Sequence, residues 1–164
     1  MKLALRYSQQ SHGFTIIELL VVLAILGVLS SVFMPLSETL LKAQQEQQLR
    51  QGLREIRTAI DAYKKAADLG ALGVTGADSG YPPDLKSLTA GTPDARAAAG
   101  GKASYFLRRL PRDPFADSAL PAEQTWKLRS YASPPDRPAP GADVFDVMSS
   151  SNAKALDGSL YNTW

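Results

Sequence analysis

The chain lacks cysteine and carries a single histidine, and these two shortages exclude several kinds of site. Without cysteine there is no disulfide, no thiolate metal site and no thiol nucleophile. The one histidine, His12, lies close to the N-terminus and leaves the rest of the chain without a histidine for a catalytic triad or a metal centre. No Gly-x-Ser-x-Gly elbow or phosphate-binding glycine motif occurs either. We therefore expect a protein that is not an enzyme.

The sequence also lacks a large excess of positive or negative charge. The formal net charge is +2, and both Lys2 and Arg6 precede Gly13, in a stretch without any acid. The residues after Gly13 are neutral overall, with 16 basic and 16 acidic side chains. A nucleic-acid-binding protein is expected to concentrate basic residues in a stripe or patch, and the sequence shows none. We do not expect nucleic acid as a partner.

A long hydrophobic run is present over residues 14–34, and Glu18 is its single charged residue. About twenty apolar residues suffice for a helix that crosses a bilayer. A charge near the middle of such a helix costs about 2.5–3.5 kcal/mol, so an acid there usually has a partner. Lys2 and Arg6 ahead of the run predict that the N-terminus stays inside and that the C-terminal part lies outside.

Three interpretations of this N-terminus compete. A secretory signal peptide would be cut after a small residue near Ser30 and Ser31, but the run is long for one. A plain signal anchor explains the length but not the acid. Cleavage after Gly13 would create an amine at Phe14, four residues before Glu18 and on the same helical face. The sequence leaves open whether Glu18 would pair with its own amine or with that of a neighbouring subunit.

The segment Gly-Phe-Thr-Ile-Ile-Glu-Leu-Leu, which begins at Gly13, resembles the processing site of type IV pilins and type II secretion pseudopilins. The resemblance implies that a prepilin peptidase cuts between Gly13 and Phe14 and that Phe14 becomes N-methylated. It also implies that Glu18 is the glutamate used in assembly. Pro35 matches a proline that the family places at the outer end of the membrane span.

After Pro35 the apolar residues recur at spacings of three and four, which predicts an amphipathic helix to about Ala67, kinked at Pro35. We expect its apolar stripe to pack on the chain's own globular domain, and its Gln-rich face to be solvated or to contact other subunits. The stripe consists of Leu49, Leu53, Ile56, Ile60 and Tyr63.

Glycines between Gly70 and Gly80 predict the end of the long helix. A short helix capped by Asp84, with Leu85 and Leu88 facing inward, is expected next, followed by a surface loop over residues 91–102. Two strands are predicted, over residues 125–131 and 144–148, joined through a proline-rich extended segment at 133–140. The aromatic residues expected in the core are Tyr105, Trp126 and Phe145.

This order of segments resembles the G-type major pseudopilins of type II secretion systems. The implied fold is α+β and pilin-like, with a long N-terminal helix packed on a small C-terminal antiparallel sheet. The expected divisions are a leader over residues 1–13, a membrane or filament-core helix over 14–34, its amphipathic continuation over 35–67 and a periplasmic domain over 68–164.

The same resemblance implies a calcium site in the C-terminal loop, for which Asp157 is the best candidate ligand. The alternative is an Asp-Gly turn in which Asp157 bonds its own backbone, and the loop is poor in the negative charge that calcium prefers. Similarly, Arg108, Arg109 and Arg112 either meet acids on a neighbouring subunit or are solvated.

The expected function is a structural subunit of the periplasmic pseudopilus, anchored in the inner membrane with a cytoplasmic N-terminus before assembly. Its implied partners are other copies of itself, the prepilin peptidase, the inner-membrane assembly platform and minor pseudopilins. A type IV pilin or minor pilin, serving adhesion, motility or DNA uptake, is the alternative within the family. Outside the family, the alternative is a signal-anchored periplasmic binding domain.

Overall fold

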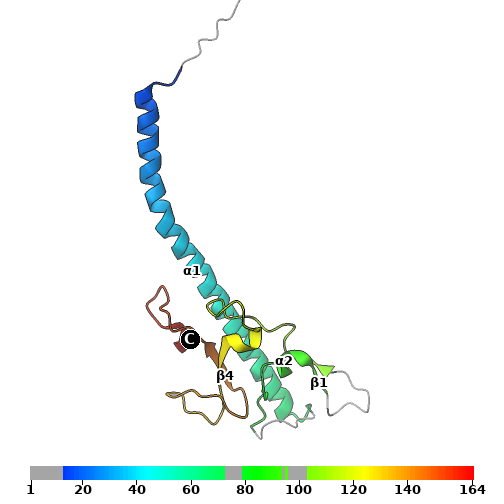
Figure 1. The fold of residues 1–164 in the computed structure, drawn as a ribbon. Coiled ribbons are helices and arrows are strands. Elements are labelled where there is room, and N and C mark those ends of the chain that lie inside the picture. Colours follow the sequence, from blue (N-terminus) through cyan, green and yellow to red (C-terminus); the bar gives the residue numbers. More distant parts are fainter. Residues whose placement is uncertain (1–12, 73–78, 94, 96–102) are drawn as a thin grey trace, which may run out of the picture. The chain divides into compact units, whose positions relative to one another are not determined.

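A computed structural model describes residues 13–72, 79–93, 95 and 103–164, without the side chains of residues 32–35. The leader up to His12, which includes Lys2 and Arg6, therefore lies outside the described residues. The longest element is helix α1, Ile16–Asp68, which begins and ends within two residues of the predicted bounds (Figure 1). The chain divides into two units, Met1–Leu40 and Leu41–Trp164.

The first unit contributes the N-terminal part of α1. Its described side chains are exposed all round the helix, although they are almost entirely apolar. By length and composition, α1 is long and apolar enough to cross a membrane. A helix that is apolar on every side requires an apolar surrounding, which in a cell is lipid or other apolar helices.

The second unit is built on the remaining turns of α1, around which the later segments of the chain are wrapped (Figure 1). The predicted stripe is confirmed, because all five of its side chains are at most 3% exposed. They pack against Leu85, Leu88, Trp126, Val144, Val147 and Tyr161. The amphipathic half of the helix is thus the central element of its own domain's core.

Short elements complete this unit. The helices are α2, Ser87–Ala90, and the 3-10 helices η1, Ala122–Thr125, and η2, Tyr161–Thr163. The strands are β1, Thr92–Pro93, β2, Ala103–Ser104, β3, Trp126–Arg129, and β4, Asp146–Ser149. Strands β1 and β2 pair antiparallel, and so do β3 and β4, with Trp126 opposite Ser149 and Arg129 opposite Asp146. The α+β fold class is confirmed.

The local predictions for the segment after Gly80 are confirmed in part. The Asp84 carboxylate accepts a hydrogen bond from the Ser87 amide at 2.8 Å, but Asp84 is not the N-cap of α2: that position is Lys86, which forms no side-chain capping bond. Leu85 and Leu88 are buried, and the proline-rich segment 133–140 contains no helix or strand.

Three predictions were wrong. The segment 91–102, expected to be a loop, contains strand β1, and the partner strand β2 begins directly after residue 102. Tyr105 is 67% exposed instead of being in the core, and Phe145 is half-buried. Glu46 is only 5% exposed, although it lies within the glutamine-rich stretch that was expected to be solvated or to contact other subunits. Its burial depends on Leu156 and Tyr161, residues distant in sequence, which local periodicity does not report.

Two close contacts of Trp126 fix the start of β3, one on α1 and one on the segment at Pro111. A Cβ at Gly52 would lie 3.4 Å from the Trp126 ring, so a residue without a side chain lets the indole approach the helix. The indole Nε1 donates to the Pro111 carbonyl at 2.9 Å, which satisfies the ring's one polar group.

A buried carboxylate, Asp113, joins the segment after Pro111 to the end of β4. It accepts hydrogen bonds from the Phe115 amide at 2.8 Å, the Ser149 hydroxyl at 2.6 Å and the Ser150 amide at 3.2 Å. Three donors offset the cost of burying the carboxylate.

Candidate processing and assembly site

The predicted cleavage position lies just outside the helix. Gly13, Phe14 and Thr15 have no regular secondary structure, and α1 begins at Ile16. Phe14 is 83% exposed. A peptide bond in exposed, non-helical backbone is open to a protease, whereas one inside a helix first requires local unfolding.

Glu18 has a local partner that was not predicted. The Thr15 hydroxyl oxygen accepts a hydrogen bond from the Glu18 amide at 3.3 Å, and a Glu18 carboxylate oxygen accepts one from the Thr15 amide at 3.5 Å. This reciprocal pair is a capping box, which satisfies two backbone donors at the start of a helix. Its signal, Thr-x-x-Glu directly before an apolar run, was visible in the sequence.

The position of Glu18 in the helix also changes the estimate of its cost. It lies in the first turn of α1, not near the middle of the apolar segment. There the positive end of the helix dipole favours a carboxylate. Glu18 is exposed, as are its apolar neighbours Ile17 and Leu19.

Pro35 lies inside α1, and the helix continues through it without interruption. Its side chain is outside the described part of the structure. The role in assembly and the kink predicted for Pro35 therefore remain predictions.

Asp157 forms the turn expected under the alternative interpretation. One carboxylate oxygen accepts hydrogen bonds from the Ser159 amide at 2.9 Å and the Ser159 hydroxyl at 2.6 Å. Gly158 between them has φ +86°, a backbone conformation that glycine adopts most easily. The Ser159 hydroxyl, followed by the Ser159 amide, lowers the pKa of Asp157.

The loop around Asp157 does not fit a calcium ion. Calcium binds six to eight oxygens, usually with several carboxylates among them. Within the described residues no three or more His, Asp or Glu side chains gather where they would hold a metal. Asn152, whose neutral amide oxygen could also bind a metal, accepts a hydrogen bond from Asn162 at 2.8 Å. Lys154 adds a positive charge to the same loop.

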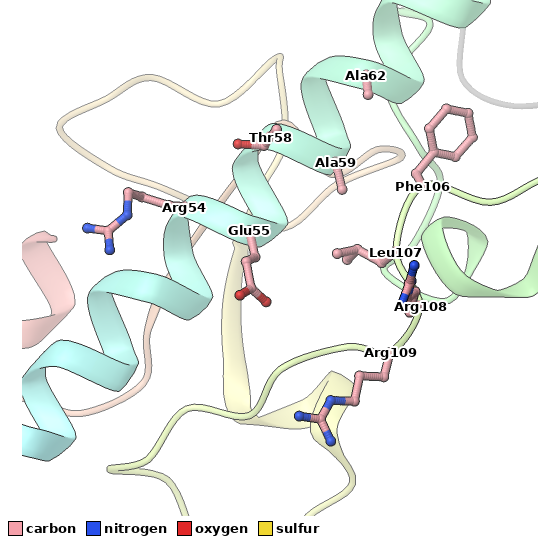
Figure 2. Close-up of a pocket in the computed structure, with 9 residues that line it drawn as sticks. All are labelled: Arg54, Glu55, Thr58, Ala59, Ala62, Phe106, Leu107, Arg108 and Arg109. Carbon is pink, nitrogen blue, oxygen red and sulfur yellow. The ribbon is translucent and has the colours of Figure 1, made fainter.

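A groove of about 600 Å³ runs beside α1 in the second unit. Figure 2 shows that α1 supplies one wall and that residues 106–109 supply the other. Three of its lining residues, Arg54, Arg108 and Arg109, form no ion pair within the described part of the chain.

Arg112 differs from Arg108 and Arg109, because its side chain forms hydrogen bonds within the same domain. Its guanidinium donates to the carbonyls of Asp117, Ser118 and Leu120 and so holds the following loop. Arg108 and Arg109 therefore remain candidates for contacts with a neighbouring subunit, whereas Arg112 bonds within its own domain.

Comparison with known proteins agrees with this geometry. Residues 8–34 match the prokaryotic N-terminal methylation motif. The chain is 31% identical to the type II secretion system core protein G of Klebsiella pneumoniae over 113 residues, which cover 65% of this chain and 71% of that protein. The chain belongs to the type II secretion core protein G family. No solved structure matches it.

Membership of the core protein G family agrees with a pseudopilin role and with an apolar N-terminal helix. The matched motif contains Gly13, Phe14 and Glu18, the residues that meet at the start of α1. The family assignment therefore agrees with an exposed, apolar N-terminal unit.

We predict that Thr15→Val weakens the start of α1 in the unprocessed chain, because valine keeps the branched shape but cannot accept the Glu18 amide. Loss of a cap costs about 0.5–2 kcal/mol, so exchange protection of the Glu18 amide should fall roughly 2- to 30-fold. Hydrogen exchange of the full chain in detergent micelles measures this. Thr15→Ser, which retains the hydroxyl, is the control, and unchanged protection in Thr15→Val would contradict the capping role.

Proposed function

We propose that this chain is a structural subunit of the periplasmic pseudopilus of a type II protein secretion system. The observation that carries the proposal is the position of Glu18. It lies in the first turn of an exposed apolar helix, four residues after the proposed new N-terminus at Phe14. Family membership supports the same role.

The proposed sequence of events begins with insertion in the inner membrane, with the N-terminus in the cytoplasm and the second unit in the periplasm. Prepilin peptidase then removes residues 1–13 and methylates Phe14. Residues 14–34 remain in the membrane until the assembly platform brings subunits together with minor pseudopilins, and residues 35–67 join them to the periplasmic domain. The protein contributes a mechanical part and no catalysis.

Assembly would exchange one set of apolar neighbours for another. In lipid, the exposed face of α1 contacts acyl chains, and in a filament it would contact the same helix of other copies. Apolar packing alone distinguishes poorly between axial positions. An ion pair between Glu18 of one copy and the Phe14 amine of the next would fix the register.

We predict that the membrane-extracted protein has a mature N-terminus at methylated Phe14. Intact-mass spectrometry of protein from a host with a prepilin peptidase measures this directly. The same chain from a host without the peptidase should keep its leader. An intact Met1 in both hosts, or cleavage near Ser31, would contradict the proposal.

We predict that Glu18→Ala is processed normally but does not assemble, because the substitution leaves the Phe14 amine buried without its carboxylate. Removing one member of a buried ion pair costs about 3–5 kcal/mol, more than a hundredfold in association at each contact. Sedimentation of sheared filaments measures the loss. Glu38→Ala, which removes another exposed acid of α1, should assemble normally; wild-type assembly of Glu18→Ala would refute the role of Glu18.

The groove beside α1 is a candidate for a second, lateral contact. Arg54, Arg108 and Arg109 form no ion pair within the described part of the chain and outnumber Glu55, the one acid of the groove, so acidic side chains of a neighbouring copy would complement them. Exposed ion pairs of this kind contribute about 0.2–1 kcal/mol each, so they would adjust the packing of subunits more than drive it.

We predict that Arg109→Glu lowers filament yield up to roughly fivefold, corresponding to about 1 kcal/mol at each interface, without changing the melting temperature. Arg112→Ala should instead destabilise the domain by about 0.5–1.5 kcal/mol, because three exposed loop carbonyls exchange the guanidinium for water. Thermal unfolding and filament sedimentation of both variants separate the two roles. Equal effects of the two substitutions on stability would contradict the distinction.

A further inference from the structure

The C-terminal segment of the second unit is fastened to α1 by one buried carboxylate. Glu46 is 5% exposed, and one of its oxygens accepts hydrogen bonds from the Leu156 amide at 2.7 Å and the Tyr161 hydroxyl at 3.0 Å. Leu156 and Tyr161 flank the Asp157 turn, so Glu46 holds both sides of this loop. Burying a carboxylate is costly, and these two donors compensate the cost only while the loop stays in place.

The Tyr161 end of this contact is fixed by packing as well. Its ring is fully buried, stacked on Phe115 at 4.1 Å between centroids and set edge-on to Trp164 at 5.1 Å. Burial, and then the hydrogen bond to Glu46, raise the pKa of Tyr161 to about 12. The phenol therefore keeps the proton that it donates at any physiological pH.

One turn further along α1, Arg50 extends the network across the loop. Its guanidinium lies 4.0 Å from Glu46, 3.7 Å from Asp157 and 4.3 Å from the centroid of the Trp164 ring. A fixed cation therefore already lies beside the one carboxylate that the loop offers, and it would repel a metal ion there.

Arg57 secures the segment at a second point. It donates to the Asp146 carboxylate at 2.8 Å, the Val147 carbonyl at 3.0 Å and the Trp164 carbonyl at 2.8 Å. The helix thus holds β4 and Trp164 together through the Arg57 side chain.

The resemblance to G-type pseudopilins implied a calcium ion in this loop, and the residues present do not fit one. We propose that Glu46, supported by Arg50, takes the place of a metal ion in holding the C-terminal loop, and that the second unit is stable without calcium. The inference concerns the folded domain alone and does not depend on processing or filament assembly.

The first test compares the thermal unfolding of the wild-type full chain in detergent micelles with EGTA and with millimolar calcium chloride. Both tryptophans, Trp126 and Trp164, lie in the second unit, so their fluorescence follows its unfolding. We expect midpoints that agree within about 1 °C. A structural calcium site at saturating metal should raise the midpoint by about 5 °C or more, and such a rise would overturn the proposal.

The second test uses variants of the network. Glu46→Ala should lower the midpoint by about 5 °C or more, equally in EGTA and in calcium, and should increase hydrogen exchange at the Leu156 amide. Gln47→Ala, at an exposed neighbouring position, is the matched control and should leave both unchanged. Recovery of the Glu46→Ala midpoint by calcium, or wild-type exchange at Leu156, would refute the role of Glu46.

Asp157→Asn distinguishes a turn residue from a metal ligand. As a turn residue, asparagine keeps an acceptor for Ser159, so we expect a small change in midpoint and the same insensitivity to calcium. A calcium-dependent stabilisation that is present in the wild type and lost in Asp157→Asn would establish Asp157 as a ligand and overturn the proposal. The wild-type comparison needs no variant, so the proposal can be tested even if Glu46→Ala fails to fold.

Discussion

The apolar stripe of α1 from Leu49 to Tyr63 is the contact on which the rest of the second unit depends. The strands there are two to four residues long, and a two-stranded hairpin of this size is not stable alone. Strands β3 and β4 and helix η2 cover the stripe through Trp126, Val147 and Tyr161, so their stability depends on the helix as well as on each other. A long helix is therefore a requirement of this small domain, independent of any membrane.

In this domain, polar side chains link segments distant in sequence, as disulfides do in many small exported domains. Three of them, Glu46, Asp113 and Arg57, connect segments 36 to 115 residues apart in the sequence. A buried carboxylate with several donors is specific, because any other arrangement of the loops leaves a charge without partners. The domain can therefore do without cysteine, and in our proposal without calcium, since its loops are selected by a few obligatory hydrogen bonds.

The features that could be predicted were those determined by residues close together in the sequence. The length of α1, its buried stripe and the existence of β3 and β4 all follow from spacing patterns, and each is confirmed within a few residues. The Thr15 capping box belongs with them, since its signal was present but overlooked. The burial of Glu46 is different: its neighbours in sequence are exposed glutamines, and its donors lie 110 and 115 residues away. The same holds for Arg112, whose three acceptors are set by the path of a loop.

The capping box bears on how Glu18 can wait in a membrane before assembly. An acid at the centre of the span would cost about 2.5–3.5 kcal/mol, but under the proposed topology the first turn would lie near the interface, where the helix dipole and the Thr15 amide favour the charge of Glu18. The cap bond is long, at 3.5 Å, and therefore weak. An amine from a neighbouring subunit offers a full opposite charge and a charge-assisted hydrogen bond in its place. In our proposal, a weak local partner suits Glu18, because its carboxylate has to be tolerated in the monomer and still gain free energy when the monomer joins a filament.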